Sequence, residues 1–304
     1  MPELPEVETI ARGVNKRIRG DRIAHVWFDR HPQPFKTPRT RQAKGLEGAA
    51  ILAVHRTGKH IVFELSSSGS APNAFESGAL KPDSHERKAL RPDSHERKAL
   101  RPDSQWIVHL GMTGRLLVTT PESPVAPHTH ARLTLASGRE LRFVDPRRFG
   151  RLEFRDLRRG DAFGAPGDEP LTIGANEFAA LFRGRRLYIK AALLNQTLLA
   201  GVGNIYADES LFHAEIRPRR RANRVTRAEL DRLRLALRQI LTHAIRLGGS
   251  SVSDYVDADG ARGFFQLEHC VYLRTGQPCR RCQTPIRRVV VAGRGTHFCP
   301  KCQR

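Results

Sequence analysis

The chain has 304 residues, of which 52 are Lys or Arg and 31 are Asp or Glu, giving a net charge of +21. This excess of positive charge indicates a polyanionic partner. Nucleic acid is favoured over a membrane surface, because no basic amphipathic stretch stands apart from the rest. No apolar run approaches the ~20 residues that span a bilayer, and no signal peptide precedes the acidic N-terminus. We therefore expect a two-domain, soluble cytoplasmic protein associated with the nucleoid.

The N-terminus reads Met1-Pro2-Glu3-Leu4-Pro5-Glu6-Val7-Glu8. Early prolines and acidic residues, followed by an apolar stripe, are typical of an ordinary helix start. A second interpretation is chemical: removal of Met1 would leave the secondary amine of Pro2, which titrates at about 7.7–8.0 and can attack a sugar or carbonyl carbon. Glu3 and Glu6 are candidate proton carriers beside it. Taken alone, the stretch favours the ordinary helix, which we expect to end near Arg19-Gly20.

Short runs rich in β-branched and aromatic residues follow this helix. We expect strands at residues 23–28, 49–55, 60–65, 106–110, 115–119, 132–135 and 141–144. Ser137-Gly138 is a plausible hairpin turn between the last two strands. Seven short strands behind one helix indicate a β-sandwich.

An interruption at residues 66–105 contains a ten-residue repeat, which runs from 81 to 90 and recurs almost unchanged from 91 to 100. Each copy is polar and contains a proline, so two or three copies cannot bury a core. We interpret the segment as a solvent-exposed insertion between two strands. Its histidines, His85 and His95, are more typical of a polar loop than of a metal site.

Glycine and proline are frequent between residues 160 and 174, which is typical of a linker between domains. Helices are expected beyond it, at residues 176–183, 188–197 and 205–213. The longest helix begins at the capping box Thr226-x-x-Glu229 and ends at Gly248-Gly249. The glycine-rich turn at residues 200–204 either brings backbone amides close to a phosphate or allows a tight turn between helices.

Four cysteines near the C-terminus give the strongest single signal. Cys279-x-x-Cys282 and Cys299-x-x-Cys302 are separated by sixteen residues, which matches a four-thiolate zinc site. We prefer zinc to paired disulfides or a redox pair, because the chain has no secretory signal and no fifth cysteine lies near these four. Four protein ligands close the coordination shell, so the Zn²⁺ is expected to be structural. Segments 286–291 and 294–298 would form a hairpin with arginines suited to phosphates, and Cys270 is left over as an ordinary thiol.

Six motifs occur in one order along the chain. They are Pro2-Glu3-Leu4-Pro5-Glu6-Val7-Glu8-Thr9, Gly58-Lys59, His109-Leu110-Gly111-Met112-Thr113-Gly114, Asp145-Pro146-Arg147-Arg148-Phe149-Gly150, Gly201-Val202-Gly203-Asn204-Ile205-Tyr206-Ala207 and Arg294-Gly295-Thr296-His297-Phe298-Cys299. Through these motifs the chain resembles the bacterial formamidopyrimidine-DNA glycosylase family over nearly its whole length, except residues 66–105.

This resemblance implies an α+β multidomain fold. A catalytic β-sandwich domain with an N-terminal helix would occupy residues 1–160, including the insertion, and a linker residues 161–175. A helix–two-turn–helix DNA-binding domain would follow at 176–264, and a zinc finger in the form of a zinc-ribbon hairpin at 265–304.

A bifunctional DNA-repair enzyme is the activity that the resemblance implies. It would remove oxidised purines such as 8-oxoguanine and formamidopyrimidines, and would then cut the abasic strand by β,δ-elimination. Its partner would be duplex DNA containing oxidised bases or abasic sites. The protein would be a monomer with one structural Zn²⁺ and no organic cofactor.

Individual residues take their expected roles from the motif positions that they match. Pro2 would attack the deoxyribose C1′ and form a Schiff base, and Glu3 would be the acid/base for sugar opening. Lys59 would serve the β-elimination and Arg294 the later elimination; without the family, Lys59 is more typical of a solvated strand end. The residues expected to fill the gap left by the everted base are Met112, Arg147 and Phe149. The positions that match family DNA contacts are His109, His128, Arg147, Arg185, Lys190 and Asn204.

Two features depart from the family pattern: the insertion has no family role, and Leu273 stands where the family usually has glycine. Leu4 and the run from Leu110 to Gly114 favour the oxidised-purine branch over the sister endonuclease, which prefers oxidised pyrimidines. The stretch that would cap the flipped base is 250–265. A non-catalytic damaged-DNA-binding protein is the alternative from another class, although a binding module needs no free secondary amine.

Overall fold

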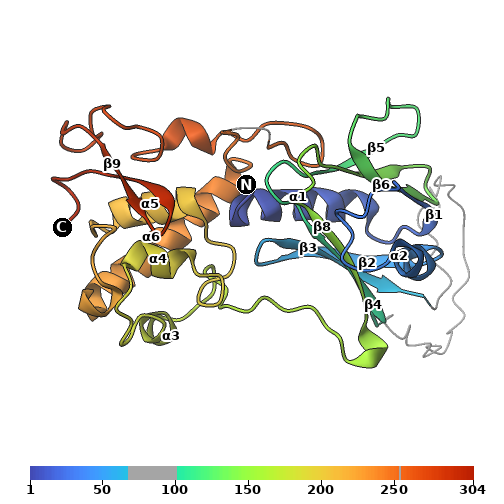
Figure 1. The fold of residues 1–304 in the computed structure, drawn as a ribbon, viewed down its shortest axis with the longest axis horizontal. Helices are drawn as coiled ribbons and strands as arrows, with labels where there is room; N and C mark the ends of the chain where they lie inside the picture. The colour runs from blue at the N-terminus through green and yellow to red at the C-terminus, as the bar shows by residue number, and fades with distance from the viewer. Residues whose placement is uncertain (68–100, 253–254) are drawn as a thin grey trace, which may run out of the picture.

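The computed structural model describes residues 1–67, 101–252 and 255–304, which form a sheet-rich half and a helical half joined by α1 (Leu4–Ile18) (Figure 1). The strands of the first half are β1 (Ile23–Phe28), β2 (Ala50–Thr57), β3 (His60–Ser66), β4 (Ser104–His109), β5 (Arg115–Thr119), β6 (Thr129–Leu135), β7 (Glu140–Val144) and β8 (Arg151–Asp156). The seven predicted strands are therefore present within a few residues of their expected ends.

Two four-stranded antiparallel sheets, in the orders β1-β6-β7-β5 and β2-β3-β4-β8, make the predicted β-sandwich. The apolar face of α1 packs into the same core as both sheets, so Ile10 and Val14 lie among buried residues such as Ile61 and Phe143. Burying one apolar face of a helix against the inner faces of the sheets is what stabilises this half.

One strand and one helix were absent from the sequence-based prediction. In β8 only Leu152 and Phe154 are buried, and the other four residues are charged, so the apolar signal is short. In α2 (Arg39–Leu46) the buried residues are Gln42 and Leu46. The Gln42 amide donates to the carbonyl of Thr37, and its oxygen accepts from the Trp106 indole. A polar anchor of this kind leaves no apolar periodicity to detect.

The predicted insertion lies in the connection between β3 and β4, which pair directly and antiparallel. β3 ends at Ser66 and β4 begins at Ser104, so the first residue and the last two residues of the predicted insertion 66–105 belong to strands. Ser67 and Asp103 close the base of the connection, because the Asp103 carboxylate accepts from the Ser67 backbone N–H at 3.0 Å. The decapeptide repeats, with His85 and His95, lie outside the described residues.

Four helices, α3 (Ala175–Ala180), α4 (Ile189–Leu194), α5 (Asn204–His213) and α6 (Arg227–Arg246), build the second half and share one apolar core. α6 begins at the predicted capping box, in which the Glu229 carboxylate accepts from the Thr226 backbone N–H at 2.8 Å. Single 3-10 turns lie at Leu157–Arg159, Ala222–Arg224 and Phe265–Glu268. Among the described residues, no helix is long and apolar enough to cross a membrane.

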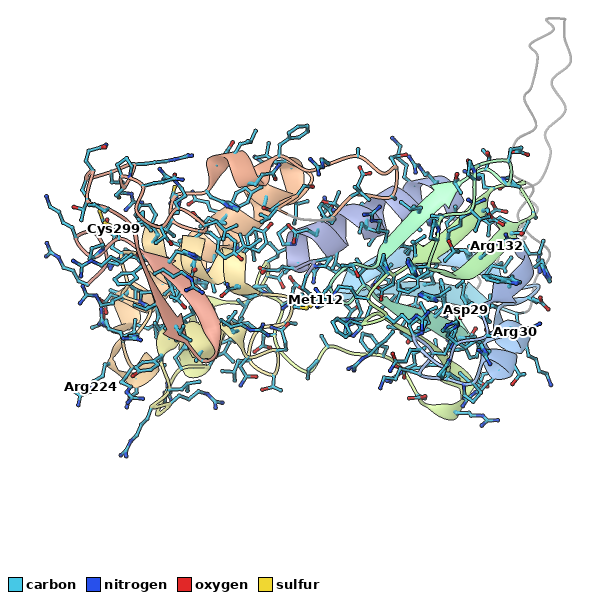
Figure 2. All side chains as sticks on the ribbon, turned by 45° about the horizontal axis from the view of Figure 1, so that its top comes forward. Asp29, Arg30, Met112, Arg132, Arg224 and Cys299 are labelled. Carbon is cyan, nitrogen blue, oxygen red and sulfur yellow. The ribbon has the colours of Figure 1, made fainter. Side chains whose placement is uncertain are left out.

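The first turn of α1 belongs to both cores. Leu4 is buried in the helical core, whereas Val7 and the later apolar residues of α1 are buried in the sandwich. The Leu4 backbone N–H also donates to the Gly201 carbonyl at 3.0 Å, just before α5. The N-terminus is therefore held at the junction of the two halves, where Figure 2 also places Met112.

The last two strands, β9 (Arg287–Val291) and β10 (Arg294–Phe298), form the predicted C-terminal hairpin. Leu273, upstream of this hairpin, adopts φ +58°, the left-handed region that favours glycine. The departure from the family's glycine thus falls at a position whose backbone geometry still suits glycine.

Candidate functional site

A cavity of about 400 Å³ opens at the junction where α1, the β2–β3 turn, the start of α5 and the C-terminal hairpin meet. Seven of the residues singled out in the sequence line it: Pro2, Glu3, Glu6, Lys59, Met112, Asn204 and Arg294. They come from widely separated segments of the chain, in both halves and in the hairpin. The remaining predicted contacts, His109, His128, Arg147, Phe149, Arg185 and Lys190, do not line this cavity.

Glu3 is the N-cap of α1 and at the same time faces the N-terminus of α5. Its carboxylate accepts from the Ile205 backbone N–H at 3.1 Å and from the Tyr206 N–H at 3.5 Å. The side chain is only 4% exposed. Burial raises its pKa from 4.5 to about 7, against the opposing charge of Lys59 and the two backbone donors. A carboxyl with this pKa can hold or release a proton near neutral pH.

Glu6, the second candidate proton carrier, is also buried at this cavity but is fully engaged. Its carboxylate accepts from the Tyr206 hydroxyl at 2.5 Å, from the Ser250 N–H at 2.8 Å and from the Glu3 N–H at 2.8 Å. Burial raises its pKa, while these donors oppose the rise. The bond to the Glu3 backbone completes the α1 capping box, so Glu6 holds the N-terminal turn in place.

The glycine-rich turn before α5 serves close packing against α1. A Cβ on Gly203 would overlap the Glu3 carboxyl, and one on Gly201, which has φ +89°, would press on Leu4. The backbone amides at the start of α5 donate to the Glu3 carboxylate. Of the two interpretations of this turn, the structure supports a tight junction whose amides bind a carboxylate of the same chain.

Lys59 lies in the tight turn between β2 and β3, next to Gly58 at φ +61°. Burial lowers the pKa of Lys59, although the nearby Glu3 charge opposes this and Arg294 reinforces it. Desolvation of this kind increases the fraction of neutral amine, which is the form that accepts a proton. Glu3, Lys59 and Arg294 all line the same cavity, so their side chains face one space.

Two adjoining loops carry the residues expected to fill the gap left by an everted base. Met112 is 40% exposed and Phe149 is 53% exposed, which is unusual for large apolar side chains. The Arg147 guanidinium lies 5.0 Å from the Phe149 ring centroid. Asp145 ties the loops together, because its carboxylate accepts from the Thr113 hydroxyl at 2.6 Å and from the Gly150 N–H at 2.7 Å.

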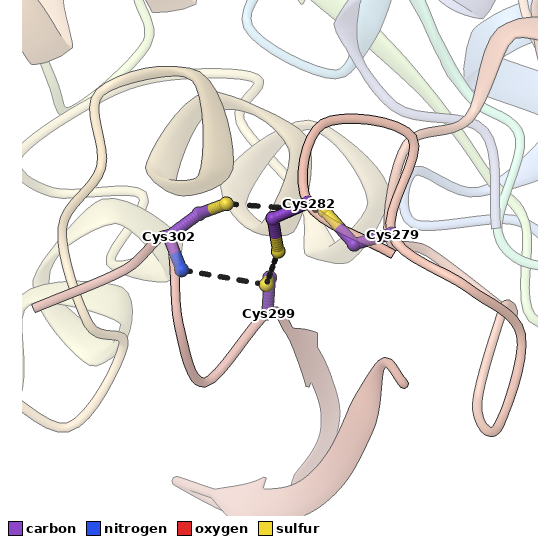
Figure 3. Close-up of side chains that lie close together, drawn as sticks. All are labelled: Cys279, Cys282, Cys299 and Cys302. Carbon is purple, nitrogen blue, oxygen red and sulfur yellow. Dashed lines mark hydrogen bonds between the residues drawn. The ribbon is translucent and has the colours of Figure 1, made fainter. Parts of the chain in front are cut away.

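The four C-terminal cysteines converge as the spacing predicted (Figure 3). The Sγ atoms of Cys279 and Cys302 are 3.9 Å apart, and those of Cys282 and Cys299 are 3.4 Å apart. Tetrahedral Zn²⁺ with Zn–S bonds of about 2.3 Å requires sulfur separations of about 3.8 Å. The backbone N–H groups of residues 281 and 302 point at two of the sulfurs. The donor set and geometry fit one structural Zn²⁺, which orders the hairpin that carries Arg294.

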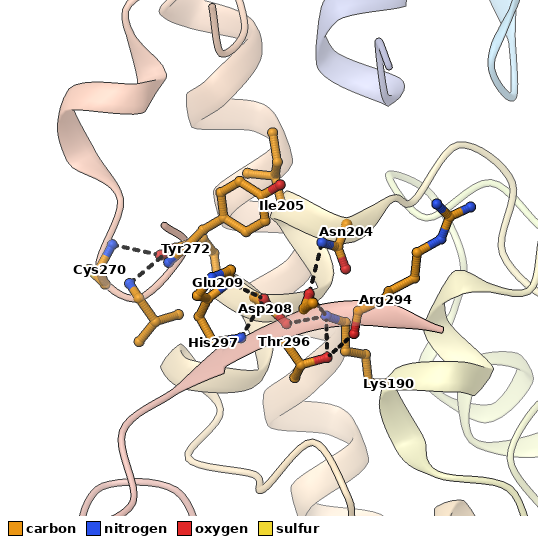
Figure 4. A network of polar contacts seen from close by, with 12 residues as sticks. Lys190, Asn204, Ile205, Asp208, Glu209, Cys270, Tyr272, Arg294, Thr296 and His297 are labelled. Carbon is orange, nitrogen blue, oxygen red and sulfur yellow. Dashed lines mark hydrogen bonds and ion pairs between the residues drawn. The ribbon is translucent and has the colours of Figure 1, made fainter. Parts of the chain in front are cut away.

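Lys190 lies in the interior of the protein, and Figure 4 shows its side chain within a network of polar contacts. It is fully buried, and its ammonium pairs with the Asp208 carboxylate at 2.6 Å. It also donates to the Gly295 carbonyl at 3.1 Å and the Thr296 hydroxyl at 2.8 Å, both in β10. This burial corrects the expectation of a direct DNA contact: Lys190 anchors the strand that begins at Arg294.

Asn204 lines the cavity but is also part of this anchor, because its amide donates to the Gly295 carbonyl at 3.0 Å. Among the other expected contacts, His109 is half-buried beside His60, and burial lowers its pKa to about 4. His128 is exposed in a left-handed conformation, and the exposed Arg185 donates to the Leu181 carbonyl. These surface positions remain predictions.

Two tyrosines of the site were not predicted from the sequence, and the backbone amides at the start of α5, which were predicted as possible phosphate donors, bind a carboxylate instead. Tyr255 and Tyr272 line the cavity, and the backbone N–H groups of Ile205 and Tyr206 bind Glu3. One signal was available for the backbone donors, because a helix that starts directly after glycine presents free N–H groups. The tyrosines carry no local signal, since only the folded chain brings them to the cavity.

Three sequence families match successive parts of the chain. They are described as the formamidopyrimidine-DNA glycosylase N-terminal domain (residues 1–152), the formamidopyrimidine-DNA glycosylase H2TH domain (166–256) and a zinc finger found in FPG and IleRS (276–304). The sandwich, the helical domain and the zinc hairpin thus all occur in the same class of protein. The fold and the matched regions define a DNA glycosylase.

Full-length relatives identify the family. The chain is 41% identical to the formamidopyrimidine-DNA glycosylase of Solibacter usitatus, covering 100% of both chains, and 42% identical to that of Thermus thermophilus, covering 100% of this chain and 98% of the relative. It is also similar to two solved structures of Lactococcus lactis Fpg, each at 33% identity. The first is a mutant in complex with Fapy-dG DNA, which matches with a TM-score of 0.81 over 100% of both chains. The second is a complex with abasic-site DNA, which matches with a TM-score of 0.80 over 99% of both chains. The chain belongs to the formamidopyrimidine-DNA glycosylase family.

Proposed function

We propose that this glycosylase removes oxidised purines, including 8-oxoguanine and formamidopyrimidines, from duplex DNA and then cuts the abasic strand through a Schiff base on Pro2. The observation that carries the proposal is the convergence of Pro2, Glu3, Lys59 and Arg294 on one cavity. The similar Lactococcus lactis protein has been solved with DNA containing Fapy-dG and with abasic-site DNA. The net charge of +21 suits a duplex substrate.

Excision would begin with the neutral Pro2 amine, once Met1 has been removed. The nitrogen lone pair forms a bond to the deoxyribose C1′, the electron pair of the glycosidic bond leaves with the base, and the N–H proton of the resulting ammonium passes to the departing base. Glu3 in its acid form gives its proton to the ring oxygen as the sugar opens, leaving an iminium at Pro2. A pKa of about 7 keeps a useful fraction of Glu3 protonated at neutral pH.

Strand cleavage would follow from the iminium. Lys59, whose pKa burial lowers, removes a proton from C2′, and the 3′ phosphate leaves with the C3′–O electron pair. In the second elimination the C4′ proton is lost to water, the 5′ phosphate leaves with the C5′–O electron pair, and the guanidinium of Arg294 stabilises its charge. Zn²⁺ takes no part in these steps; when bound, it orders the hairpin on which Arg294 is carried.

Met112, Arg147 and Phe149 would replace the stacking lost when the damaged base leaves the duplex. Extrusion of a base costs a few kcal/mol of stacking and pairing, which an inserted side chain partly restores. His109, His128, Arg185 and Asn204 would hold the phosphate backbone in register. The exposure of Met112 and Phe149 supports this role, because nothing within the described chain covers them fully.

We also propose a monomer acting in the cytoplasm at the nucleoid.

Oxidised pyrimidines are a second candidate substrate class. One of the similar Lactococcus lactis structures, with TM-score 0.79 and 32% identity, holds DNA containing an oxidised pyrimidine. A panel of duplexes, each with one oxidised purine or pyrimidine, distinguishes the two substrate classes by their kcat/KM values. A purine preference supports the proposal, whereas faster excision of pyrimidines would overturn it.

Trapping of the covalent intermediate tests the nucleophile. Borohydride should reduce the iminium and leave an adduct between 8-oxoguanine duplex and the N-terminal peptide. A chain with an N-terminal tag should give no adduct and no strand cutting, whereas a matched chain with the same tag at the C-terminus should give both. Intact DNA binding without any adduct in the untagged protein would support the non-catalytic alternative instead. An adduct mapped to an internal lysine would refute Pro2 as the nucleophile.

Glu3→Gln separates the two halves of the proposed reaction. Loss of a positioned general acid typically slows a reaction by about 10²–10⁴-fold, so excision of 8-oxoguanine should fall in this range. The sugar of a pre-formed abasic site is a hemiacetal that equilibrates with its open aldehyde without base excision, so borohydride trapping on it should persist. Equal loss on both substrates would contradict the role assigned to Glu3.

A further inference from the structure

A second group of metal-ligand side chains lies outside the four-cysteine site. Glu209 and His213 are one helical turn apart on α5, and Cys270 comes from the segment after the 3-10 turn at Phe265–Glu268. One ligand atom from each lies within 4.8 Å of the other two. The i, i+4 spacing places both α5 side chains on one face, which is a common arrangement for two ligands of one ion.

The distances between these atoms suit a tetrahedral ion. Cys270 Sγ and His213 Nε2 are 3.7 Å apart. An ion with Zn–S of about 2.3 Å and Zn–N of about 2.0–2.1 Å holds sulfur and nitrogen about 3.6 Å apart. A thiolate, an imidazole and a carboxylate together form a borderline-soft donor set, which favours zinc and its thiophilic relatives over magnesium or calcium.

Glu209 is buried, and no lysine, arginine or histidine of the described chain forms an ion pair with it. Its carboxylate accepts three backbone N–H groups, from Cys270 at 2.9 Å, Val271 at 3.0 Å and Tyr272 at 2.8 Å. A carboxylate offers about four lone-pair directions, so one remains, on the oxygen bonded only to Cys270. A buried charge without a counter-ion is costly, and a bound cation would compensate it.

An open cavity of about 920 Å³ gives access to this group of side chains. Glu209, His213 and Cys270 line it, so water can supply a fourth ligand and an ion can enter. Arg246 and Arg280 line the same cavity. Their positive charge weakens cation binding, so the ion here should leave more readily than the one held by four thiolates.

We propose that Glu209, His213 and Cys270 bind a second thiophilic divalent cation of the Zn²⁺ class, independently of the base-excision chemistry. The site differs from the structural one in having three protein ligands and an open position. Tyr272 connects this site to the cavity that Pro2 lines, because its backbone N–H donates to Glu209 and the residue also lines that cavity.

Metal counting on the whole, reduced protein tests the proposal. After mild chelation, elemental analysis should find one zinc per chain; equilibrium dialysis against Zn²⁺ or Co²⁺ should then add a second equivalent. The second Co²⁺ should give the absorption of a tetrahedral thiolate site. The variants His213→Ala and Cys270→Ser should each bind the second equivalent at least tenfold more weakly. Both should keep the first zinc and normal strand cutting.

His243→Ala is the matched control, because His243 lines the same cavity but pairs with Glu268 at 2.6 Å. That variant should keep the second equivalent. Wild-type protein that binds only one ion under these conditions would overturn the proposal. So would a second equivalent that survives both His213→Ala and Cys270→Ser, since it would then bind elsewhere. Circular dichroism of His213→Ala and Cys270→Ser verifies that both variants are folded.

Discussion

The buried carboxyl of Glu3 makes the stability of the protein depend on pH in a way that can be measured. Because burial raises the pKa of Glu3 from 4.5 to about 7, the folded chain holds this proton more tightly than the unfolded chain does. Raising the pH from 4.5 to 7 therefore favours unfolding. The contribution of Glu3 to stability is greatest below pH 4.5, falls through this window and is constant above about pH 7.

The size of the effect follows from the two pKa values. A full difference from 4.5 to about 7 corresponds to about 3 kcal/mol at about 1.4 kcal/mol per pH unit. Between about pH 6 and about pH 8.5, where the zinc thiolates are retained, the remaining loss is about 1.4 kcal/mol. Glu3→Gln keeps an oxygen that can accept from the Ile205 N–H but has no proton to lose, so its stability should lack this fall.

Urea unfolding followed by tryptophan fluorescence measures the difference, because both tryptophans, Trp27 and Trp106, belong to the sandwich that packs on α1. Wild-type protein should lose about 1.4 kcal/mol more than Glu3→Gln between the two pH values. The exposed Glu177→Gln is the matched control and should behave as wild type does. An equal loss in wild type and Glu3→Gln would refute the raised pKa, and base release that does not slow above pH 7 would contradict its catalytic use.

Three further substitutions test the packing around the site. Gly203→Ala places a Cβ where the Glu3 carboxyl lies, so excision of 8-oxoguanine should fall by about 10²-fold with the zinc content unchanged, as a single-turnover assay would show. Leu273→Gly relieves a left-handed residue that is 55% exposed, and thermal unfolding should show a gain of about 1 kcal/mol; a loss would indicate that the side chain packs usefully. Asp208→Asn removes the carboxylate that pairs with the buried Lys190, so the free energy of unfolding in urea should fall by about 3–5 kcal/mol. Adding Lys190→Met should recover most of this loss. If the double variant is no more stable than Asp208→Asn, the broken ion pair is not the cause of the loss.

The sequence alone determined the features that depend on local spacing. Two-residue gaps between cysteines predict the zinc site, because both sulfurs of each pair then reach one ion. Alternation and helical periodicity predict seven strands and the apolar face of α1, and the ordered motifs indicate the family. α2 and β8 were not predicted because Gln42 is held by the distant Trp106, and Leu152 and Phe154 by pairing with β4, which leaves too little periodicity within either segment.

Only the tertiary structure decided how the site residues are charged and where they lie. Lys190 occupies a sequence position that matches a family DNA contact, but its side chain is buried against Asp208, because α4, α5 and β10 meet there. The pKa of Glu3 depends on burial between two cores, and Gly203 is needed because α1 meets α5 at that point. Burial and electrostatic fields come from atoms brought together by long-range packing, so no local pattern encodes them. Taken alone, the first eight residues indicate an ordinary helix start, and the fold brings Lys59 and Arg294 to the same cavity as Pro2.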